Sequence, residues 1–158
     1  MRYIVVLVFV GLSVASIAAA YYLAAPQTTE RLEPHSHLCN GNALCISDKV
    51  TSIIDGDTIY LKNHKIRLSL VNTPEKNQPG FDDATAFTRL TCPVGSTVIV
   101  DQDDGQPYDQ FGRMVAKVTC DGKVLNAELL YNGHANILTQ YCAVSEFSNE
   151  DWALAYGC

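Results

Sequence analysis

Alternating apolar and polar positions predict three short β-strands in the middle of the chain. Residues 49–54 and 57–62 are rich in β-branched and apolar side chains and flank Asp55-Gly56, a dipeptide typical of tight hairpin turns. Residues 65–71 read KIRLSLV, in which apolar and polar side chains alternate with the period of a strand. The pattern predicts a meander of three antiparallel strands.

Helical spacing first appears after this meander. Residues 82–91 place Ala84, Phe87 and Leu90 at helical intervals and carry two acids in the first turn, where they stabilise a helix N-terminus. The later elements that we expect are strands at 96–101 and 113–119, a helix at 125–132 that ends at Gly133, and a last helix with a capping box from Ser148 to Asp151.

The order of these elements defines the expected fold. Five strands, a helix between the third and fourth strands, and further helices at the end of the chain fit an α+β fold. We expect a five-stranded OB-type Greek-key β-barrel with about three helices. A generic α+β sheet with helices on one face is the alternative.

The first 25 residues have a different composition. Residues 3–25 carry no charge and follow Arg2, which is the pattern of a signal peptide. The apolar run is also long enough for a membrane-spanning helix, so a retained N-terminal anchor is the alternative. Both interpretations predict export, with the protein secreted or anchored on the outer face of the cytoplasmic membrane. Residues 26–47 are expected to form a tether with a cysteine-closed loop, and residues 48–158 the folded domain.

Six cysteines follow the apolar segment. An even number in an exported chain predicts up to three disulfides, although fifteen pairings are open. The pairs that we expect are Cys39–Cys45, Cys92–Cys120 and Cys142–Cys158. The alternative is a metal site in which His35 and His37 join Cys39 and Cys45, but these residues lack the usual C-x2-C spacing.

The net charge argues against simple attraction of a polyanion. Without Arg2 the chain has 10 basic and 17 acidic residues, a net charge of −7. A protein of this charge does not draw in nucleic acid through its overall field. Nucleic-acid binding would therefore require a local basic site or a bound cation.

Oxygen-bearing side chains gather where the predicted strands end. Asp55 and Asp57 lie at the hairpin turn, and Asn72, Thr73 and Glu75 follow the third strand. Carboxylate, amide and carbonyl oxygens are ligands that Ca²⁺ prefers. No Cys or His is close to this cluster in the sequence, which argues against zinc. The spacing therefore predicts a calcium site.

Two arginines complete the candidate chemistry. Arg67 lies on the third strand, and Arg113 begins a later strand after a Phe-Gly step. Two guanidinium groups beside a carboxylate-bound cation would form a clamp for a phosphate. Each residue alone also fits an ordinary role, such as a turn former or a surface ion pair. The chemical interpretation depends on their joint spacing.

Five ordered motifs resemble the staphylococcal nuclease (thermonuclease) family over roughly residues 48–156: IDGDT, RLSLVNTPE, ATAFT, DQFGR and LNAELLYNGHA. The resemblance implies an OB-type barrel and Ca²⁺-dependent hydrolysis of DNA and RNA phosphodiesters that leaves 3′-phosphates. It also implies residue roles: Asp57, with Asp55 nearby, as calcium-binding acid, Thr73 as a main-chain carbonyl ligand, Arg67 and Arg113 as catalytic arginines, and Glu75 as catalytic glutamate.

The chain departs from the family pattern at several positions. Asn72 stands where the family usually has a second metal-binding aspartate, Phe111 replaces a tyrosine, and Gln110 replaces a lysine. These changes predict weaker substrate capture and a higher demand for metal, with the reaction centre retained. Tyr108, Phe111 and Tyr141 could offer stacking faces for bases, although Phe111 also fits a core position.

Two functions from different classes follow. The first is a Ca²⁺-dependent nuclease, expected to be a monomer with DNA and RNA as partners. The second is a non-catalytic OB-type module that binds nucleic acid. Asn72 and the acidic composition favour the module, whereas the presence of Arg67, Glu75 and Arg113 together favours the enzyme.

Overall fold

The structure is a computed structural model that describes residues 38–158. The predicted leader or anchor at 3–25, and with it the expected N-terminal helix, lies outside the described residues, as does the tether up to residue 37. No helix between residues 38 and 158 is long and apolar enough to cross a bilayer.

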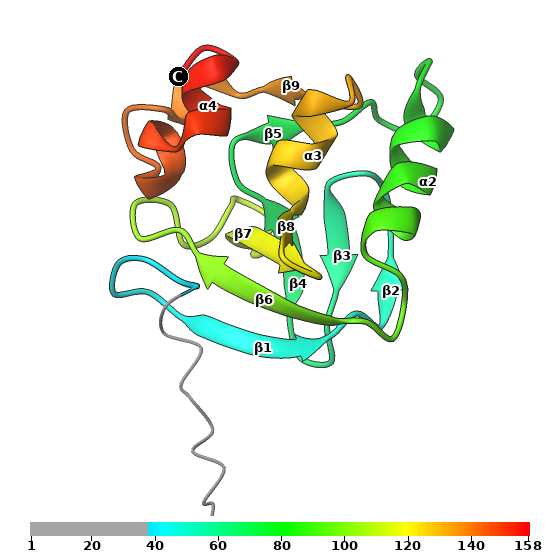
Figure 1. Ribbon diagram of the computed structural model, residues 1–158, viewed down its shortest axis with the longest axis horizontal. Helices are drawn as coiled ribbons and strands as arrows, with labels where there is room; N and C mark the ends of the chain where they lie inside the picture. Colours follow the sequence, from blue (N-terminus) through cyan, green and yellow to red (C-terminus); the bar gives the residue numbers. More distant parts are fainter. Residues whose placement is uncertain (1–37) are drawn as a thin grey trace, which may run out of the picture. The chain divides into compact units, whose positions relative to one another are not determined.

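A mixed β-sheet and three α-helices make up the described part of the chain (Figure 1). Along the sheet the strands are ordered β1-β6-β7-β4-β3-β2, and β8 pairs with β7. These strands are β1 (Cys45–Lys49), β2 (Ser52–Ile53), β3 (Thr58–Tyr60), β4 (Lys65–Leu68), β6 (Thr97–Gln102), β7 (Met114–Cys120) and β8 (Lys123–Val124). The meander β2-β3-β4 is antiparallel, as predicted.

One parallel pair positions the candidate arginines. Strands β4 and β7 run parallel, with Arg67 opposite Val115. Because Arg113 immediately precedes β7, this register places the two arginines two residue positions apart on neighbouring strands. The α+β class and the mixed sheet are consistent with an OB-like fold, but the predicted count of five strands does not match the seven strands in this sheet.

The extra strand at the N-terminal edge was not predicted. Strand β1 begins at Cys45, inside the expected tether, and pairs antiparallel with β6 from Cys45↔Asp101 to Lys49↔Thr97. The Val50 amide then donates to the Ser96 carbonyl at 3.0 Å before the chain continues into β2. β1 and β2 are therefore consecutive in the chain yet lie at opposite ends of the strand order.

The third predicted strand, residues 65–71, is interrupted. β4 ends at Leu68, and Leu70 adopts a left-handed backbone with φ 62°. The chain then forms β5 (Val71–Asn72), which pairs with β9 (Asn136–Ile137) in a second, two-stranded sheet. Leu70 is only 2 % exposed, so its side chain points inward although it lies in a turn. The alternation of apolar and polar residues in the sequence therefore looks the same as in a continuous strand.

Helix α2 (Phe81–Thr91) matches the predicted position, and the predicted apolar face is correct at Ala84 and Phe87 but wrong at Leu90. Ala84 is buried, whereas Leu90 is 80 % exposed. Two threonines take part in the buried face instead, and the Thr88 hydroxyl donates to the Gly56 carbonyl at 2.6 Å. This hydrogen bond fastens α2 to the hairpin loop that carries the candidate acids.

The C-terminal elements are shorter than expected. They are α3 (Leu125–Tyr131), α4 (Asp151–Ala155) and two 3₁₀ turns, η2 (Thr139–Tyr141) and η3 (Glu146–Asn149). Gly133, with φ 72°, follows α3 as predicted. The capping box from Ser148 to Asp151 is wrong, because Ser148 lies inside η3. The N-cap of α4 is Glu150, whose side chain makes no capping hydrogen bond. Ser145 instead caps η3, where its hydroxyl accepts from the Phe147 amide.

The six cysteines come together in the three expected pairs. The Cα–Cα distances are 6.0 Å for Cys39–Cys45, 5.6 Å for Cys92–Cys120 and 5.3 Å for Cys142–Cys158. The described part of the chain contains no free cysteine. The first pair closes a loop beside β1, and the last holds the C-terminal residue to the segment after η2.

A buried charge cluster attaches the C-terminal segment to the sheet. Lys117 on β7 is only 6 % exposed, and its Nζ lies 3.3 Å from Asp101 Oδ2 on β6 and 2.6 Å from Glu150 Oε1. Its ammonium lies 4.7 Å from the ring centroid of the buried Phe147. Glu150 also accepts from Trp152 Nε1 at 2.5 Å. One lysine thus joins β6, β7, η3 and the start of α4.

Candidate active site

Asp57 occupies the tight loop between β2 and β3. A Cβ on the preceding Gly56 would lie 2.7 Å from Thr73 Cγ2 and 2.9 Å from Ala84 Cβ, so this loop packs closely against its neighbours. Asp57 is 3 % exposed, and its Oδ2 accepts from the Thr73 amide at 2.7 Å and the Thr73 hydroxyl at 2.9 Å. The carboxylate therefore joins the hairpin to the segment after β5.

Arg67 reaches the other side of the same carboxylate. Its Nη1 lies 3.0 Å from Asp57 Oδ1 and donates to the Val71 carbonyl at 2.8 Å. Its Nη2 donates to Asn72 Oδ1 at 2.9 Å. Groups from the hairpin loop and from β5 thus hold the guanidinium in one orientation, so its positive charge has a fixed position.

The charged groups around Arg67 lie close enough to shift one another's pKa values. Burial lowers the pKa of Arg67, the charge of Asp57 opposes that effect, and the positive charge of Arg113 lowers the pKa further. Burial and the negative charge of Asp57 raise the pKa of Asp55. The Asp55 Oδ1 atom accepts from the Asp57 amide at 3.2 Å, so Asp55 shapes the turn while Asp57 faces the arginine.

Arg113 is positioned by the loop before β7. Its Nε donates to Asp109 Oδ2 at 2.5 Å, and its backbone amide donates to Asp109 Oδ1 at 2.9 Å. Burial alone would raise the pKa of Asp109, but these hydrogen bonds, a third from the Phe111 amide and the charge of Arg113 lower it. The Nη1 of Arg113 donates to the Thr58 hydroxyl at 3.2 Å.

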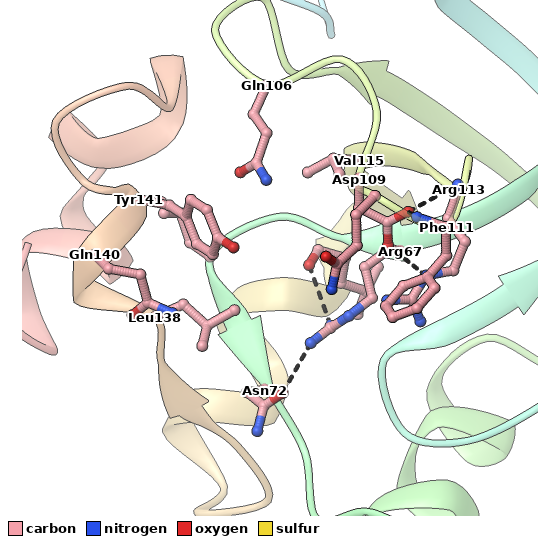
Figure 2. Close-up of a pocket in the computed structure, with 13 residues that line it drawn as sticks. Arg67, Asn72, Gln106, Asp109, Phe111, Arg113, Val115, Leu138, Gln140 and Tyr141 are labelled. Carbon is pink, nitrogen blue, oxygen red and sulfur yellow. Dashed lines mark hydrogen bonds and ion pairs between the residues drawn. The ribbon is translucent and has the colours of Figure 1, made fainter.

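Both arginines line a cleft of about 320 Å³ (Figure 2). Phe111 and Arg113 form one side, while Leu138, Gln140 and Tyr141 from the segment around η2 form the other. The remaining lining side chains are Leu68, Leu70, Asn72, Gln106, Asp109, Gln110 and Val115. Apart from the arginines and Asp109, the cleft is lined by neutral side chains.

A buried carboxylate, Asp103, joins three segments close to the cleft in the chain. Asp103 has no exposed surface, and its Oδ2 accepts from the hydroxyls of Ser69 and Ser145. Its Oδ1 accepts from the amides of Gly105 and Gln106. The turn after β4, the loop after β6 and the segment before η3 therefore meet at one side chain.

The structure brings most of the predicted reaction centre together. Asp57, Arg67, Asn72 and Thr73 are in direct contact, and Arg113 joins them through the Thr58 hydroxyl. Glu75 is exposed and does not line the cleft, although its charge acts on Arg67.

The aromatic candidates separate from one another. Tyr141 and Phe111 both line the cleft, and Phe111 is 73 % exposed, so the core interpretation of Phe111 is wrong. Arg113 lies over the Phe111 ring at 5.4 Å from its centroid. Tyr108 is 57 % exposed but does not line the cleft, and it instead forms an isolated bridge with Met114.

The side chains around Asp57 offer oxygen atoms, which are the ligands that a hard cation prefers. Asp57 Oδ1 and Asn72 Oδ1 both contact the guanidinium of Arg67, and Asp57 Oδ2 accepts from the Thr73 amide. Arg67 therefore occupies the region that the first two oxygens face. No group of three or more His, Cys, Asp or Glu side chains arranged for a metal occurs within residues 38–158, so a cation here would depend on the amide and carbonyl oxygens.

Two functional residues escaped the sequence argument. Asp109 sets the orientation of Arg113, and Thr58 joins Arg113 to Asp57. Thr58 is part of the IDGDT motif, but a threonine in a strand is ordinary by propensity. Asp109 lies in a polar loop four residues before Arg113, where an aspartate is common in turns. The sequence therefore did not indicate that it contacts the guanidinium.

Comparison with known families supports the same assignment. The family described as staphylococcal nuclease homologue matches residues 65–153. This match spans more than half of the chain and includes β4, β7, both arginines and the C-terminal helices. The chain therefore belongs to the staphylococcal nuclease family.

Curated relatives of this chain carry nuclease names. Endonuclease YncB of Bacillus subtilis (strain 168) is 33% identical over 98 residues, which cover 56% of this chain and 46% of the relative. The probable staphylococcal-like nuclease CAN2 of Oryza sativa subsp. japonica is 31% identical over 101 residues, covering 63% of this chain and 26% of the relative. The chain thus spans less than half the length of either relative.

Proposed function

We propose that the protein hydrolyses phosphodiester bonds of DNA and RNA in a Ca²⁺-dependent reaction. Water attacks phosphorus in line, the bond from phosphorus to the 5′-oxygen breaks, and the products carry a 3′-phosphate and a protonated 5′-hydroxyl. One observation carries the proposal: Arg67 and Arg113 both line one cleft, and both are joined to the Asp57 carboxylate. The family and the names of its nuclease members support it.

The two guanidiniums supply the main electrostatic effect. A phosphodiester gains negative charge on its non-bridging oxygens and on the departing 5′-oxygen as the transition state forms. Fixed donors aimed at that charge lower the barrier because they need no reorganisation during the reaction. Arg67 is held on three sides and Arg113 on two, so their orientation is set before substrate arrives.

Glu75 is assigned to the attacking water. It follows Pro74 in a turn where its amide donates to Gln78 Oε1 at 2.8 Å, and its side chain is exposed to solvent. An exposed carboxylate near Arg67 can take a proton from a water molecule or orient that water for attack. Glu75 does not line the cleft, so in either role it would reach the water from outside the lining residues.

Asp57, Asn72 and the carbonyl of Thr73 would hold Ca²⁺. When bound there, the cation would withdraw charge from a phosphoryl oxygen and help fix the scissile group. Asn72 contributes an oxygen but no negative charge, so the chain has a weaker site than one with two aspartates. The alternative function, a non-catalytic nucleic-acid-binding module, is favoured by this asparagine and by the acidic composition.

Replacing Asn72 by aspartate tests both functions. Asn72→Asp is expected to lower the Ca²⁺ concentration for half-maximal cleavage of a single-stranded DNA oligonucleotide by about tenfold, because a second carboxylate adds charge to the donor set. The measurement is the initial cleavage rate across a Ca²⁺ titration. Asn40→Asp, an exposed change on the loop before β1, serves as the matched control.

The outcomes separate the alternatives. If neither the wild type nor Asn72→Asp cleaves the oligonucleotide but both bind it in a fluorescence-anisotropy assay, the chain is a binding module. If both cleave and the midpoint of the Ca²⁺ titration is the same for the two proteins, Asn72 is not a ligand and the calcium site must be reassigned.

We also propose that the protein is exported. The uncharged segment at 3–25 and the three cysteine pairs are both typical of chains that leave the cytoplasm. Whether that segment is removed or serves as an anchor, the catalytic domain would meet nucleic acid outside the cell.

A further inference from the structure

Thr58 lies between the two halves of the candidate site. It is the first residue of β3, directly opposite Arg67 in the antiparallel register, and it is 1 % exposed. Its hydroxyl accepts from Arg113 Nη1 at 3.2 Å and donates to Asp57 Oδ1 at 3.3 Å. This side chain is therefore the hydrogen-bonded link between Arg113 and the acid that Arg67 contacts.

Two contacts determine how the Arg113 guanidinium is oriented. Asp109 holds Nε, and Thr58 holds Nη1. A planar fork fixed at one nitrogen can still swing about that contact, whereas a fork fixed at two has one plane. Among residues 38–158, the hydrogen bonds of the Arg113 side chain are made by Nε and Nη1, so Nη2 keeps its donors for a ligand in the cleft that Arg113 lines.

The chemistry of a hydroxyl suits this position. A hydroxyl can accept from a guanidinium and donate to a carboxylate at the same time, which neither a lysine ammonium nor an apolar side chain can do. It is also neutral. A second carboxylate at this position would pair with Arg113, as Asp109 does, and would weaken the pull of the guanidinium on a phosphate.

We propose that Thr58 is a positioning residue that acts through Arg113. Its hydroxyl sets the plane of the Arg113 fork relative to Asp57, so that the fork and the cation site address the same phosphate. This inference rests on the proposed nuclease function and deepens it, since it assigns to Thr58 on β3 the orientation of one of the two arginines.

Thr58→Val removes the hydroxyl and keeps the shape of the side chain, while Thr58→Ser keeps the hydroxyl. At saturating Ca²⁺ we expect Thr58→Val to lower kcat on single-stranded DNA by about 10- to 100-fold with a smaller change in KM, because a hydrogen bond to a charged group is lost. Thr58→Ser should retain most of kcat. Thr51→Val, which removes a hydroxyl that donates to the Tyr60 carbonyl on the exposed side of the hairpin, is the control and should leave kcat unchanged.

A double-mutant cycle and a spectroscopic readout distinguish positioning from packing. In an Arg113→Ala background, Thr58→Val should cause no further loss of kcat, because the group on which it acts is absent. In ¹H–¹⁵N spectra, the guanidinium signals of Arg113 should be sharp in the wild type and in Thr58→Ser. In Thr58→Val they should be broadened by exchange between orientations of the guanidinium.

Several results would overturn the inference. They are an unchanged kcat in Thr58→Val, equal losses in the valine and serine variants, or losses that add fully to Arg113→Ala. Absence of cleavage by the wild type would instead reject the nuclease function. In that case the spectra decide on Thr58 alone, and unchanged Arg113 signals in Thr58→Val would reject its contact with the guanidinium.

Discussion

Arg113→Ala is expected to lower kcat on single-stranded DNA by about 10² to 10³-fold, the usual effect of removing one preorganised donor from a transition state. Arg113 is held by Asp109 and Thr58 and lines the cleft beside Arg67, so its charge lies where a phosphate would gain negative charge. Arg113→Lys should recover only part of the rate, because a lysine keeps the charge but not the fork. The measurement is kcat and KM for oligonucleotide cleavage.

The matched control for this change is Arg89→Ala. Arg89 is exposed in the last turn of α2 and does not line the cleft. Replacing it by alanine removes the same charge from the protein as Arg113→Ala does. Its substitution should leave kcat within about twofold, as is usual for surface changes. If Arg89→Ala and Arg113→Ala lose activity equally, the effect comes from net charge and the assignment of Arg113 is incorrect.

Lys117→Met is expected to lower the free energy of unfolding by about 3 to 5 kcal/mol at neutral pH, because it leaves the buried Asp101 carboxylate without its partner. Lys117 is 6 % exposed and contacts both Asp101 and Glu150. For a domain of this size the loss corresponds to a fall in Tm of about 10 to 20 °C, measured by thermal unfolding. Lys123→Met, an exposed lysine on β8, should change Tm little.

The pH dependence of Lys117→Met has a definite sign. Burial raises the pKa of Asp101 even in the presence of Lys117. Without the lysine, the folded state holds a proton on Asp101 more tightly than the unfolded state does, so protonation favours folding as the pH falls. The deficit of the variant relative to wild type should therefore be smaller in mildly acidic than in neutral solution. A constant deficit would show that Asp101 is not the unpaired group.

The sequence predicted the elements whose signals are local. The Asp55-Gly56 turn, the strands on either side of it and the glycine after α3 depend on backbone preferences within a few residues. The number of cysteines predicted disulfides but left fifteen pairings open, and the three expected pairs were one choice among them. Asp57, Arg67 and Arg113 could be proposed as a group from their joint spacing and from the motifs that resemble the nuclease family.

The failures arose where distant segments decide the outcome. Residues 45–49 read CISDK, with little strand character, and they form β1 because β6 supplies a pairing edge. Leu70 takes a strained φ because the turn after β4 is tied by Ser69 to Asp103 and by the following residues to β9. Local periodicity contains none of this information, since it cannot distinguish a strand from a turn that keeps the same side chain inward.

The site shows the same division between local and distant information. The residue types were readable, but their partners were not. Asn72 appeared as a weakened metal ligand, and the structure shows that its oxygen also orients Arg67. Asn72 carries no charge, so Asp57 is the carboxylate in direct contact with Arg67. The proposed Ca²⁺ site would have a weaker set of ligands than one with two aspartates, and Arg67 would have one anionic neighbour fewer to compete with a phosphate.

Cleavage of a single-stranded DNA oligonucleotide in Ca²⁺ and in excess chelator tests the central claim most directly, with the wild type compared with Asp57→Asn. The account predicts cleavage by the wild type that requires Ca²⁺ and stops in chelator, and a variant whose rate stays low at every Ca²⁺ concentration although circular dichroism shows that it is folded. Cleavage by the wild type that continues at full rate in chelator, or an Asp57→Asn variant with the wild-type dependence on Ca²⁺, would contradict it.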